Sequence, residues 1–357
     1  MIWSLFLSIF LWTTCNATDP TRHKRSMPSA EVKYWSLPVP YTWNLDYPVY
    51  DELAVYDALS FWTNETCVRF RFAAPGSEPF MLKIGSYGVG GCQSFNGKQD
   101  FQPQEIALDP SCSVKREIAY SLGKMIEHGR PDRDQYVRFI ADNCCALRQS
   151  AEFFKSPYVD SNGFSVGYDY GSCMHHSRKD YSKNGGDTLV TLDPNFQMTI
   201  GQTDPSFADV KKMNRAYCGS ICDNSPITCR NGGYPNPNNC AVCKCPPAFA
   251  GTLCGGVTTG TGTCGTRALT ATTVSQTVAA SGPGTCYYVI SSPADTQIGF
   301  QLTNLTITSS FEDTCKGNFL EINYLRDFAL TGSKHPGFAV GQNFSAKRHG
   351  KRDRLWK

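Results

Sequence analysis

Apolar residues recur at helical spacing near the start of the globular part of the chain. Leu53, Tyr56, Leu59 and Trp62 follow one another at intervals of three residues, a spacing that indicates one face of a helix. Asp51 stands just before this run, and a short acidic side chain is a common N-cap residue. The pattern predicts an amphipathic helix that begins after Asp51.

Strand and helix patterns follow one another in the next part of the chain. Residues 68–72 alternate apolar side chains with arginines, which predicts a half-buried strand, and residues 79–84 predict another. A second helix is predicted from about residue 115 to residue 125, because its apolar positions share one face. From there to Tyr217, glycines and Asp-Pro pairs predict a loop-rich chain.

The composition changes at Cys218, where a cysteine-rich stretch begins. Six cysteines fall within 33 residues, and so short a stretch cannot bury a core of its own. They are Cys222, Cys229, Cys240, Cys243, Cys245 and Cys254. A Gly/Thr-rich linker follows, and residues 264–344 carry the short alternating runs typical of an all-β sandwich. The whole pattern predicts an α+β protein of several domains.

The charge distribution argues against a nucleic-acid-binding protein. The chain has 357 residues, of which 41% are hydrophobic and 18% charged, so general disorder is excluded. Its net charge is +3, with +5 in residues 347–357 and −4 in residues 26–346. The acidic body offers no basic patch of the kind that binds a phosphate backbone.

The N-terminal segment predicts export from the cell. Residues 2–12 are apolar but too short to span a bilayer, and the small residues Cys15 and Ala17 predict a signal peptide over residues 1–17. Without Cys15, 16 of the 17 cysteines remain, an even number that suits an oxidising compartment. No later segment has transmembrane length, so we expect a secreted protein without a membrane span.

Further processing signals agree with this route. The basic cluster that ends at Arg25 predicts cleavage before Ser26, with residues 18–25 released as a short propeptide. Three glycosylation sequons begin at Asn64, Asn304 and Asn343.

One helix and one later turn carry the motifs that identify a family. Residues 116–127 read REIAYSLGKMIE, and residues 172–176 read SCMHH. Trp35, the run PYT at 40–42, the run TCVRF at 66–70, and two further cysteines, Cys92 and Cys112, add to the pattern. Together these segments resemble the astacin family of secreted zinc endopeptidases, and the resemblance covers about residues 26–218. It implies an astacin-like metzincin catalytic domain.

The resemblance also implies a zinc site whose histidines are replaced in this chain. Active members carry H-E-x-x-H-x-x-G-x-x-H, and the three histidine positions match Arg116, Tyr120 and Ile126. A guanidinium is a permanent cation, a phenol must first lose a proton of pKa near 10, and isoleucine has no donor atom. Glu117 remains but is expected to be vestigial, because no metal activates a water for it. No cofactor is therefore expected, unless zinc is held in an atypical site.

Two retained residues have roles that the family implies. Met174 matches the Met-turn beneath the metal site. Glu127 matches the residue that receives the buried amine of the mature N-terminus, which would here belong to Ser26. The family also implies the disulfides Cys67–Cys218 and Cys92–Cys112.

The region after Cys218 resembles two extracellular modules. Residues 219–254 resemble an EGF-like module, because Arg230-Asn231-Gly232-Gly233 follows the second of the six cysteines. That resemblance implies the pairs Cys222–Cys240, Cys229–Cys243 and Cys245–Cys254. A zinc site is disfavoured there, since no two short Cys-x-x-Cys knuckles are present. Residues 264–344 resemble an incomplete CUB domain with a Cys264–Cys286 disulfide, and a basic tail covers 345–357. The pairing of four cysteines stays open: Cys144, Cys145, Cys173 and Cys315.

Three functional hypotheses follow. The leading one is a secreted, catalytically inactive astacin-like protein that binds extracellular peptides or proteins. The second is an active zinc metalloendopeptidase with an unusual metal site, which the retained Glu117 favours. The third is an adhesion or matrix protein that acts through its EGF-like and CUB-like modules. Chelator-sensitive proteolysis separates the first hypothesis from the second.

Overall fold

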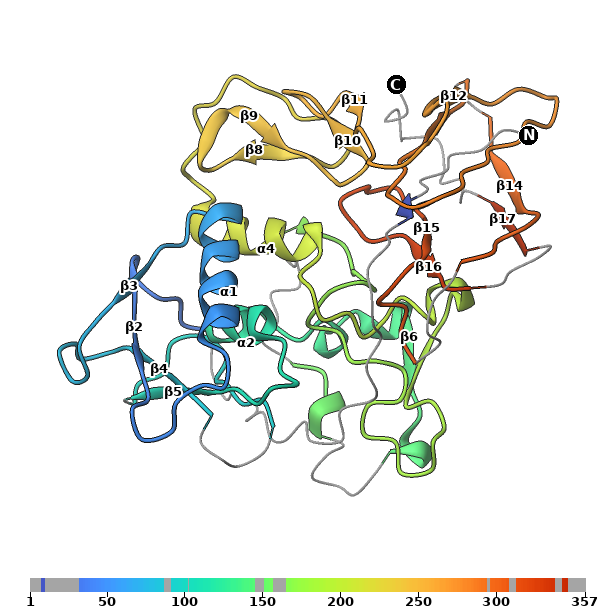
Figure 1. The fold of residues 1–357 in the computed structure, drawn as a ribbon. Helices are drawn as coiled ribbons and strands as arrows, with labels where there is room; N and C mark the ends of the chain where they lie inside the picture. Colours follow the sequence, from blue (N-terminus) through green and yellow to red (C-terminus); the bar gives the residue numbers. More distant parts are fainter. Residues whose placement is uncertain are drawn as a thin grey trace.

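A computed structural model describes the chain at residues 8–9, 32–86, 91–101, 103–144, 151–156, 165–293, 296–307, 313–337 and 342–345 (Figure 1). The predicted propeptide and the predicted signal peptide, except for a two-residue strand, β1 (Ser8–Ile9), lie outside these ranges. Most of the basic tail does too. Within the described ranges, no helix combines the length and the apolar character that crossing a membrane requires.

A four-stranded sheet lies in the N-terminal part of the chain. It consists of β2 (Val39–Trp43), β3 (Phe70–Phe72), β4 (Leu82–Gly85) and β5 (Gln104–Ala107). The strands lie in the order β3-β2-β4-β5, and every neighbouring pair is parallel. Beyond β5, Gln93 forms an antiparallel bridge with Ala107. The strand predicted from residue 68 therefore begins at Phe70, at one edge of the sheet.

The first predicted helix forms as α1 (Glu52–Glu65), and the Asp51 side chain accepts a hydrogen bond from the Ala54 amide. The predicted apolar face is wrong at its N-terminal end. Leu53 and Tyr56 are exposed, whereas Val55, Ala58, Leu59 and Trp62 are buried. Three residues turn a helix by about 300°, so a strict three-residue spacing moves around the helix, and Leu53 ends up opposite Trp62.

Two further helices follow α1 along the chain. α2 (Val114–Ser121) is shorter than predicted because Gly123, at φ +96°, turns the chain out of the helix. α4 (Phe207–Cys218) lies where the sequence pattern predicts only loops. Ser206 and Asp209 form a capping box at its start, a signal that marks a helix N-terminus.

The helices α1, α2 and α4 and the four-stranded sheet share one hydrophobic core with the turn around Met174. Trp62 of α1 is fully buried and donates a 2.9 Å hydrogen bond from its indole N–H to the Lys115 carbonyl. Trp35 donates in the same way to the Ser121 carbonyl at the end of α2. Met174 and residues of α4 complete this core, so α2 is held from several sides.

Short elements connect α2 to α4. The strands β6 (Val137–Phe139) and β7 (Leu189–Thr191) pair antiparallel. The single-turn 3-10 helices are η1 (Glu127–Gly129), η2 (Arg133–Gln135), η3 (Ala141–Asn143), η4 (Ala151–Phe153) and η6 (Pro194–Phe196).

The cysteine-rich stretch after α4 forms two small hairpin-like sheets (gold in Figure 1). One pairs β8 (Tyr234–Asn236) with β9 (Asn239–Lys244), and the other pairs β10 (Phe249–Ala250) with β11 (Gly256–Val257). Both pairs are antiparallel.

In the described residues, the C-terminal strands lie in separate small sheets and do not form the predicted all-β sandwich. β12 (Ala268–Thr270) pairs with β13 (Val289–Ser291), and β14 (Gly299–Leu302) pairs with β17 (Gln342–Ser345). β15 (Leu320–Ile322) lies between β1 and β16 (Ser333–His335). Val274, an apolar residue of this region, is 73% exposed and belongs to no such core.

These C-terminal strands nevertheless share a core with the first part of the chain. Tyr168, Phe196 and Ile200 pack in one cluster with Leu320 and Ile322. Backbone bonds reinforce the contact, since the Cys315 amide donates to the Met198 carbonyl at 2.9 Å. The region from Cys264 onward is thus bound to the first part of the chain by a continuous core.

Candidate active site

The residues that match the family's metal positions lie on α2 and just after it. Arg116, Glu117 and Tyr120 project from α2, and each is at most 2% exposed. Ile126 follows the turn at Gly123 and is partly buried. A Cβ atom at Gly123 would come within 2.7 Å of Val32, so close packing as well as the positive φ requires glycine there.

Glu117 is held inside the protein. Its carboxylate accepts a 2.6 Å hydrogen bond from the Ser94 hydroxyl, and Ser94 itself is 4% exposed. Ser94 lies one residue after Gln93, which bridges to Ala107, the last residue of β5. The sheet edge therefore fixes the position of the Glu117 side chain.

The side chains at the three matching positions do not fit a zinc ion. Isoleucine supplies no donor atom, and a divalent ion about 4 Å from the Arg116 guanidinium would be repelled by about 8 kcal/mol at an effective dielectric constant of 20. Within the described residues, no group of three or more His, Cys, Asp or Glu side chains could hold a metal ion. These positions therefore do not reproduce the zinc site of the family's motif.

Three buried histidines lie beside this region. The ring of His128 lies 4.1 Å from that of His176 and 5.3 Å from that of His175, measured between centroids. His128 Nδ1 accepts the His176 amide at 3.1 Å, so its proton is on Nε2, which donates to the Glu152 carbonyl at 3.1 Å. His128 is therefore a neutral imidazole.

His175 is neutral for a similar reason. Its Nδ1 donates to the His176 carbonyl at 2.7 Å, and its Nε2 accepts from the Tyr168 hydroxyl at 2.7 Å. Burial lowers the pKa of His175 to about 4 and, with the neighbouring histidines, holds the pKa of His128 well below its usual range. His176 has a carboxylate partner, with Nδ1 3.1 Å from Asp180 Oδ2.

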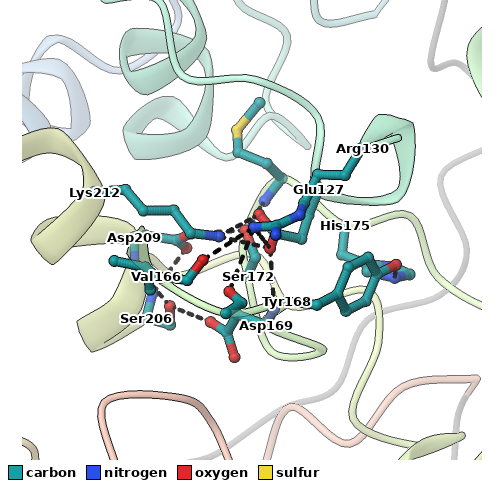
Figure 2. A network of polar contacts seen from close by, with 12 residues as sticks. Glu127, Arg130, Val166, Tyr168, Asp169, Ser172, His175, Ser206, Asp209 and Lys212 are labelled. Atoms are coloured by element: carbon teal, nitrogen blue, oxygen red, sulfur yellow. Dashed lines mark hydrogen bonds and ion pairs between the residues drawn. The ribbon is translucent and has the colours of Figure 1, made fainter. Parts of the chain in front are cut away.

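A network of buried charges contacts the turn that contains Met174, at Ser172 and Cys173. Figure 2 shows its members Glu127, Asp209 and Lys212. Both oxygens of Glu127 contact Lys212 Nζ, at 2.5 and 2.6 Å, and Asp209 contacts Lys124 at 2.8 Å. Burial opposes ionisation of Glu127, but Lys212, Lys124 and Arg130 together lower the pKa of its carboxyl group. We call these residues, with Asp169, the Glu127 network.

The network also holds the turn. The Asp209 carboxylate accepts hydrogen bonds from the Ser172 hydroxyl and the Cys173 amide, at 2.7 and 2.8 Å. The Asp169 carboxylate accepts the Ser206 hydroxyl at 2.6 Å and the Thr331 amide at 2.9 Å. The turn is thereby linked to α4 and to the C-terminal region.

The other predicted site residues differ in how far the structure describes them. Arg25 and Ser26 lie outside the described residues, so the pairing of the Ser26 amine with Glu127 stays a prediction. The side chains of Asn64 and Asn304 are exposed, and nothing is described of that of Asn343. Cys144, Cys173 and Cys315 are buried thiols, and Cys145 is outside the described residues.

Within the described residues, twelve cysteines form six disulfides, in the same pairs as the family and module resemblances imply. They are Cys67–Cys218, Cys92–Cys112, Cys222–Cys240, Cys229–Cys243, Cys245–Cys254 and Cys264–Cys286.

Among the members of the Glu127 network, only Glu127 has a role that the sequence predicts. Lys212, Asp209 and Asp169 have no recognisable motif in common, and they lie in a part of the chain that was predicted to be loops. The one available signal was the capping box Ser206-x-x-Asp209, which marks the start of α4 and places Lys212 one turn after Asp209.

Comparison with known proteins assigns the family. The profile of the peptidase family Astacin matches residues 27–218. The chain is 42% identical over 319 residues to zinc metalloproteinase nas-34 of Caenorhabditis elegans, covering 88% of this chain and 52% of that protein. Zinc metalloproteinase nas-30 of the same organism is 35% identical over 319 residues, with 87% and 41% covered. The chain thus spans about half the length of the curated relatives it matches.

A solved structure gives a weaker match. High choriolytic enzyme 1, a hatching enzyme zinc-protease from Oryzias latipes, has a TM-score of 0.45 and 26% identity, covering 55% of this chain and 98% of its own.

These findings correct one prediction. The prediction that no cofactor is expected is contradicted, because the family match is to a peptidase family and the relatives are named zinc metalloproteinases. The family match covers residues 27–218, more than half of the chain. The chain therefore belongs to the astacin family of peptidases.

Proposed function

We propose that this astacin-family chain is a secreted protein that binds extracellular peptides or protein segments without hydrolysing them. The observation that carries the proposal is the buried position of Arg116, which argues against zinc-dependent hydrolysis. A guanidinium that is 1% exposed stands on α2 next to Glu117, where the family's motif has its first histidine. A permanent cation at that place opposes a divalent ion instead of binding it.

The surroundings of Glu117 support a structural role for this carboxylate. A general base must reach the proton that it abstracts, and a catalytic zinc site keeps one position open for water. Glu117 is 1% exposed and accepts the Ser94 hydroxyl inside the protein. In this arrangement the carboxylate anchors α2 to the segment beside β5.

The regions after Cys218 extend the proposal. We propose that residues 219–254 form an EGF-like module and that residues 264–344 are related to a CUB domain, although their described strands pack against the domain at 26–218 instead of forming a sandwich of their own. The three disulfides of the first region and Cys264–Cys286 of the second support this division. Modules of this kind would add extracellular contact surface, in agreement with the predicted signal peptide.

A second candidate function is peptide hydrolysis at an atypical zinc site. The names of the relatives and the retained Glu117 favour it. In that case, chelators and the substitution Glu117→Gln would each abolish activity.

A peptide library incubated with the purified, natively secreted protein tests the proposal. Retained peptides should be recovered at full length by mass spectrometry, and the Glu117→Gln variant should retain the same set. Peptides cleaved by the native protein but not by Glu117→Gln would contradict the proposal and support hydrolysis.

A further inference from the structure

Large apolar side chains are exposed on one flank of the N-terminal part of the chain. They come from the connection between β2 and α1, from the first turns of α1 and from β3, which lie side by side (blue in Figure 1). Each is at least 44% exposed: Leu45, Tyr47, Tyr50, Leu53, Tyr56 and Phe72. We call these six residues the α1 surface.

Ring contacts make the α1 surface continuous from the helix to β3. The Tyr56 ring lies 5.6 Å from that of Trp43, and the Trp43 ring lies 5.9 Å from that of Tyr41, measured between centroids. The Tyr41 ring in turn lies 5.8 Å from that of Phe72. All three contacts are edge-to-face, a favoured arrangement of aromatic rings. A contiguous exposed apolar surface, unlike scattered single residues, is typical of an interaction site.

The α1 surface faces away from α2. Trp62 donates its indole N–H to the Lys115 carbonyl of α2, and Leu53 lies on the opposite face of α1 from Trp62. The α1 surface is therefore separate from the residues that match the family's metal positions.

The charges along this surface have one sign. Residues 34–68 hold five carboxylates and no lysine, arginine or histidine. One of the five, Glu65, is paired with Lys244 at 2.7 Å. The other four are exposed and, in the described part of the chain, form no ion pair: Asp46, Asp51, Glu52 and Asp57. They stand between or beside the apolar residues of the surface and give it a negative rim.

The cations nearest in the sheet do not neutralise this rim. Arg71, next to Phe72, contacts Glu78 at 2.5 Å. Lys83 of β4 is in register with Thr42 of β2. Successive side chains of a strand point to opposite faces, so Lys83 and Thr42 lie on the other face of the sheet from Trp43.

We infer that the α1 surface is a docking site for a basic segment of an extracellular polypeptide. Arginine and lysine side chains are attracted both to carboxylates and to the faces of tyrosine and tryptophan rings, and this surface offers the two together. A second copy of the chain is a poorer occupant, since a two-fold contact would bring the same carboxylates against each other. The inference names the partner's chemistry for the proposed function and rests on that proposal only for the extracellular setting.

Binding of a synthetic peptide to the purified, natively secreted protein tests this inference. The probe alternates arginine, leucine and serine, and a matched peptide carries glutamate in place of arginine. Fluorescence anisotropy of the labelled peptides gives the Kd at low and at high ionic strength. The arginine peptide should bind, more weakly as salt is added, and the glutamate peptide should not.

Apolar substitutions locate the bound peptide. Tyr50→Ala combined with Leu53→Ala should raise the Kd of the arginine peptide by about tenfold, as the loss of central apolar contacts does at other interfaces. Leu192→Ala combined with Val274→Ala is the matched control, because both side chains are also more than half exposed but lie elsewhere. This control should leave the Kd unchanged. All four side chains are exposed, so thermal unfolding should show native midpoints for both variants.

Charge substitutions test the rim. Glu52→Gln combined with Asp57→Asn should raise the Kd about threefold at low ionic strength and less at high ionic strength. Asp142→Asn combined with Asp223→Asn removes the same charge from two other exposed positions. This control should leave the Kd unchanged, which separates the rim from the net charge of the protein.

Several results would overturn the inference. They are no binding of the arginine peptide, equally tight binding of the glutamate peptide, and a Kd that the surface variants do not change. A dimer in sedimentation velocity that Tyr50→Ala with Leu53→Ala converts to a monomer would assign the surface to a second copy instead. Cleavage of the bound arginine peptide would contradict the proposed function and leave this inference standing.

Discussion

The Ser94 hydroxyl donates a 2.6 Å hydrogen bond to the Glu117 carboxylate in the protein interior. Ser94 comes from the segment that bridges to β5, and Glu117 comes from α2. The contact therefore joins the sheet edge to the helix that carries the family's motif. Glu117, the acid–base residue that the chain retains from this motif, therefore has a structural partner in Ser94.

Loss of this bond should reduce stability. We expect Ser94→Ala to lower the free energy of unfolding by about 1–3 kcal/mol, because a buried carboxylate loses a donor. Ser77→Ala is the control, since Ser77 bonds the Ala74 carbonyl at the exposed surface. It should change stability by less than about 0.5 kcal/mol. Urea unfolding measures both, and equal small changes would mean that Ser94 is dispensable to Glu117.

Gly171 should be required for docking of the C-terminal region. A Cβ atom there would lie 2.4 Å from the Thr331 side chain, so Gly171→Ala must push this segment away. We expect a loss of about 1–3 kcal/mol, as for other overpacked contacts, and faster hydrogen exchange at the Thr331 amide, which donates to Asp169. Gly256→Ala, whose added Cβ would lie 3.5 Å from the Ala250 carbonyl, should leave that exchange unchanged. Unchanged exchange at the Thr331 amide in both variants would show that Gly171 and Thr331 are not in close contact.

Acidification should destabilise the protein between about pH 6.5 and pH 4. His175 has a pKa of about 4 in the folded chain against about 6.5 when unfolded. Between these values the unfolded state binds more protons, so stability is full above pH 6.5 and falls as the pH approaches 4. His128 and His335 shift in the same direction.

The shift at His175 alone corresponds to about 3 kcal/mol. Urea midpoints measured at several pH values should therefore fall steadily through this window, and His175→Gln should flatten the slope. The buried carboxylates Glu127 and Asp209 have lowered pKa values, so their protonation destabilises the protein only at a lower pH. A constant midpoint from pH 7.5 to pH 4.5 would show that these histidines are not buried as neutral groups.

The two disulfides that differ most in loop length should also differ in how much each contributes to the unfolding free energy. Cys67–Cys218 spans 151 residues and Cys245–Cys254 spans 9. Loop-closure entropy gives at most about 5 kcal/mol for the first and about 3 kcal/mol for the second. Double alanine variants of each pair should lower the unfolding free energy in that order. A larger loss for the short pair would show that local packing, and not chain entropy, dominates.

Local signals predicted local structure well. Asp51 marked the start of α1, and the motif in residues 116–127 marked α2. The start of α4 was missed, although Ser206 and Asp209 carried a capping signal, because glycine and proline punctuation outweighed it.

The Glu127 network was not predictable in the same way. Lys212 and Glu127 are separated by 85 residues, and nothing in either local sequence names the other. Asp169 and Thr331 are 162 residues apart, and their contact depends on a core shared by two regions that the sequence presented as separate modules. Such pairings depend on tertiary packing, which a hydrophobic pattern does not encode.

The measurement that tests the central claim most directly is hydrolysis of an unfolded protein substrate, with and without a zinc chelator. The native protein should show no chelator-sensitive hydrolysis. Restoring the family's three histidines by Arg116→His, Tyr120→His and Ile126→His should introduce it, provided that the variant folds with the native disulfides. Chelator-sensitive hydrolysis by the native protein that disappears in Glu117→Gln would contradict the account.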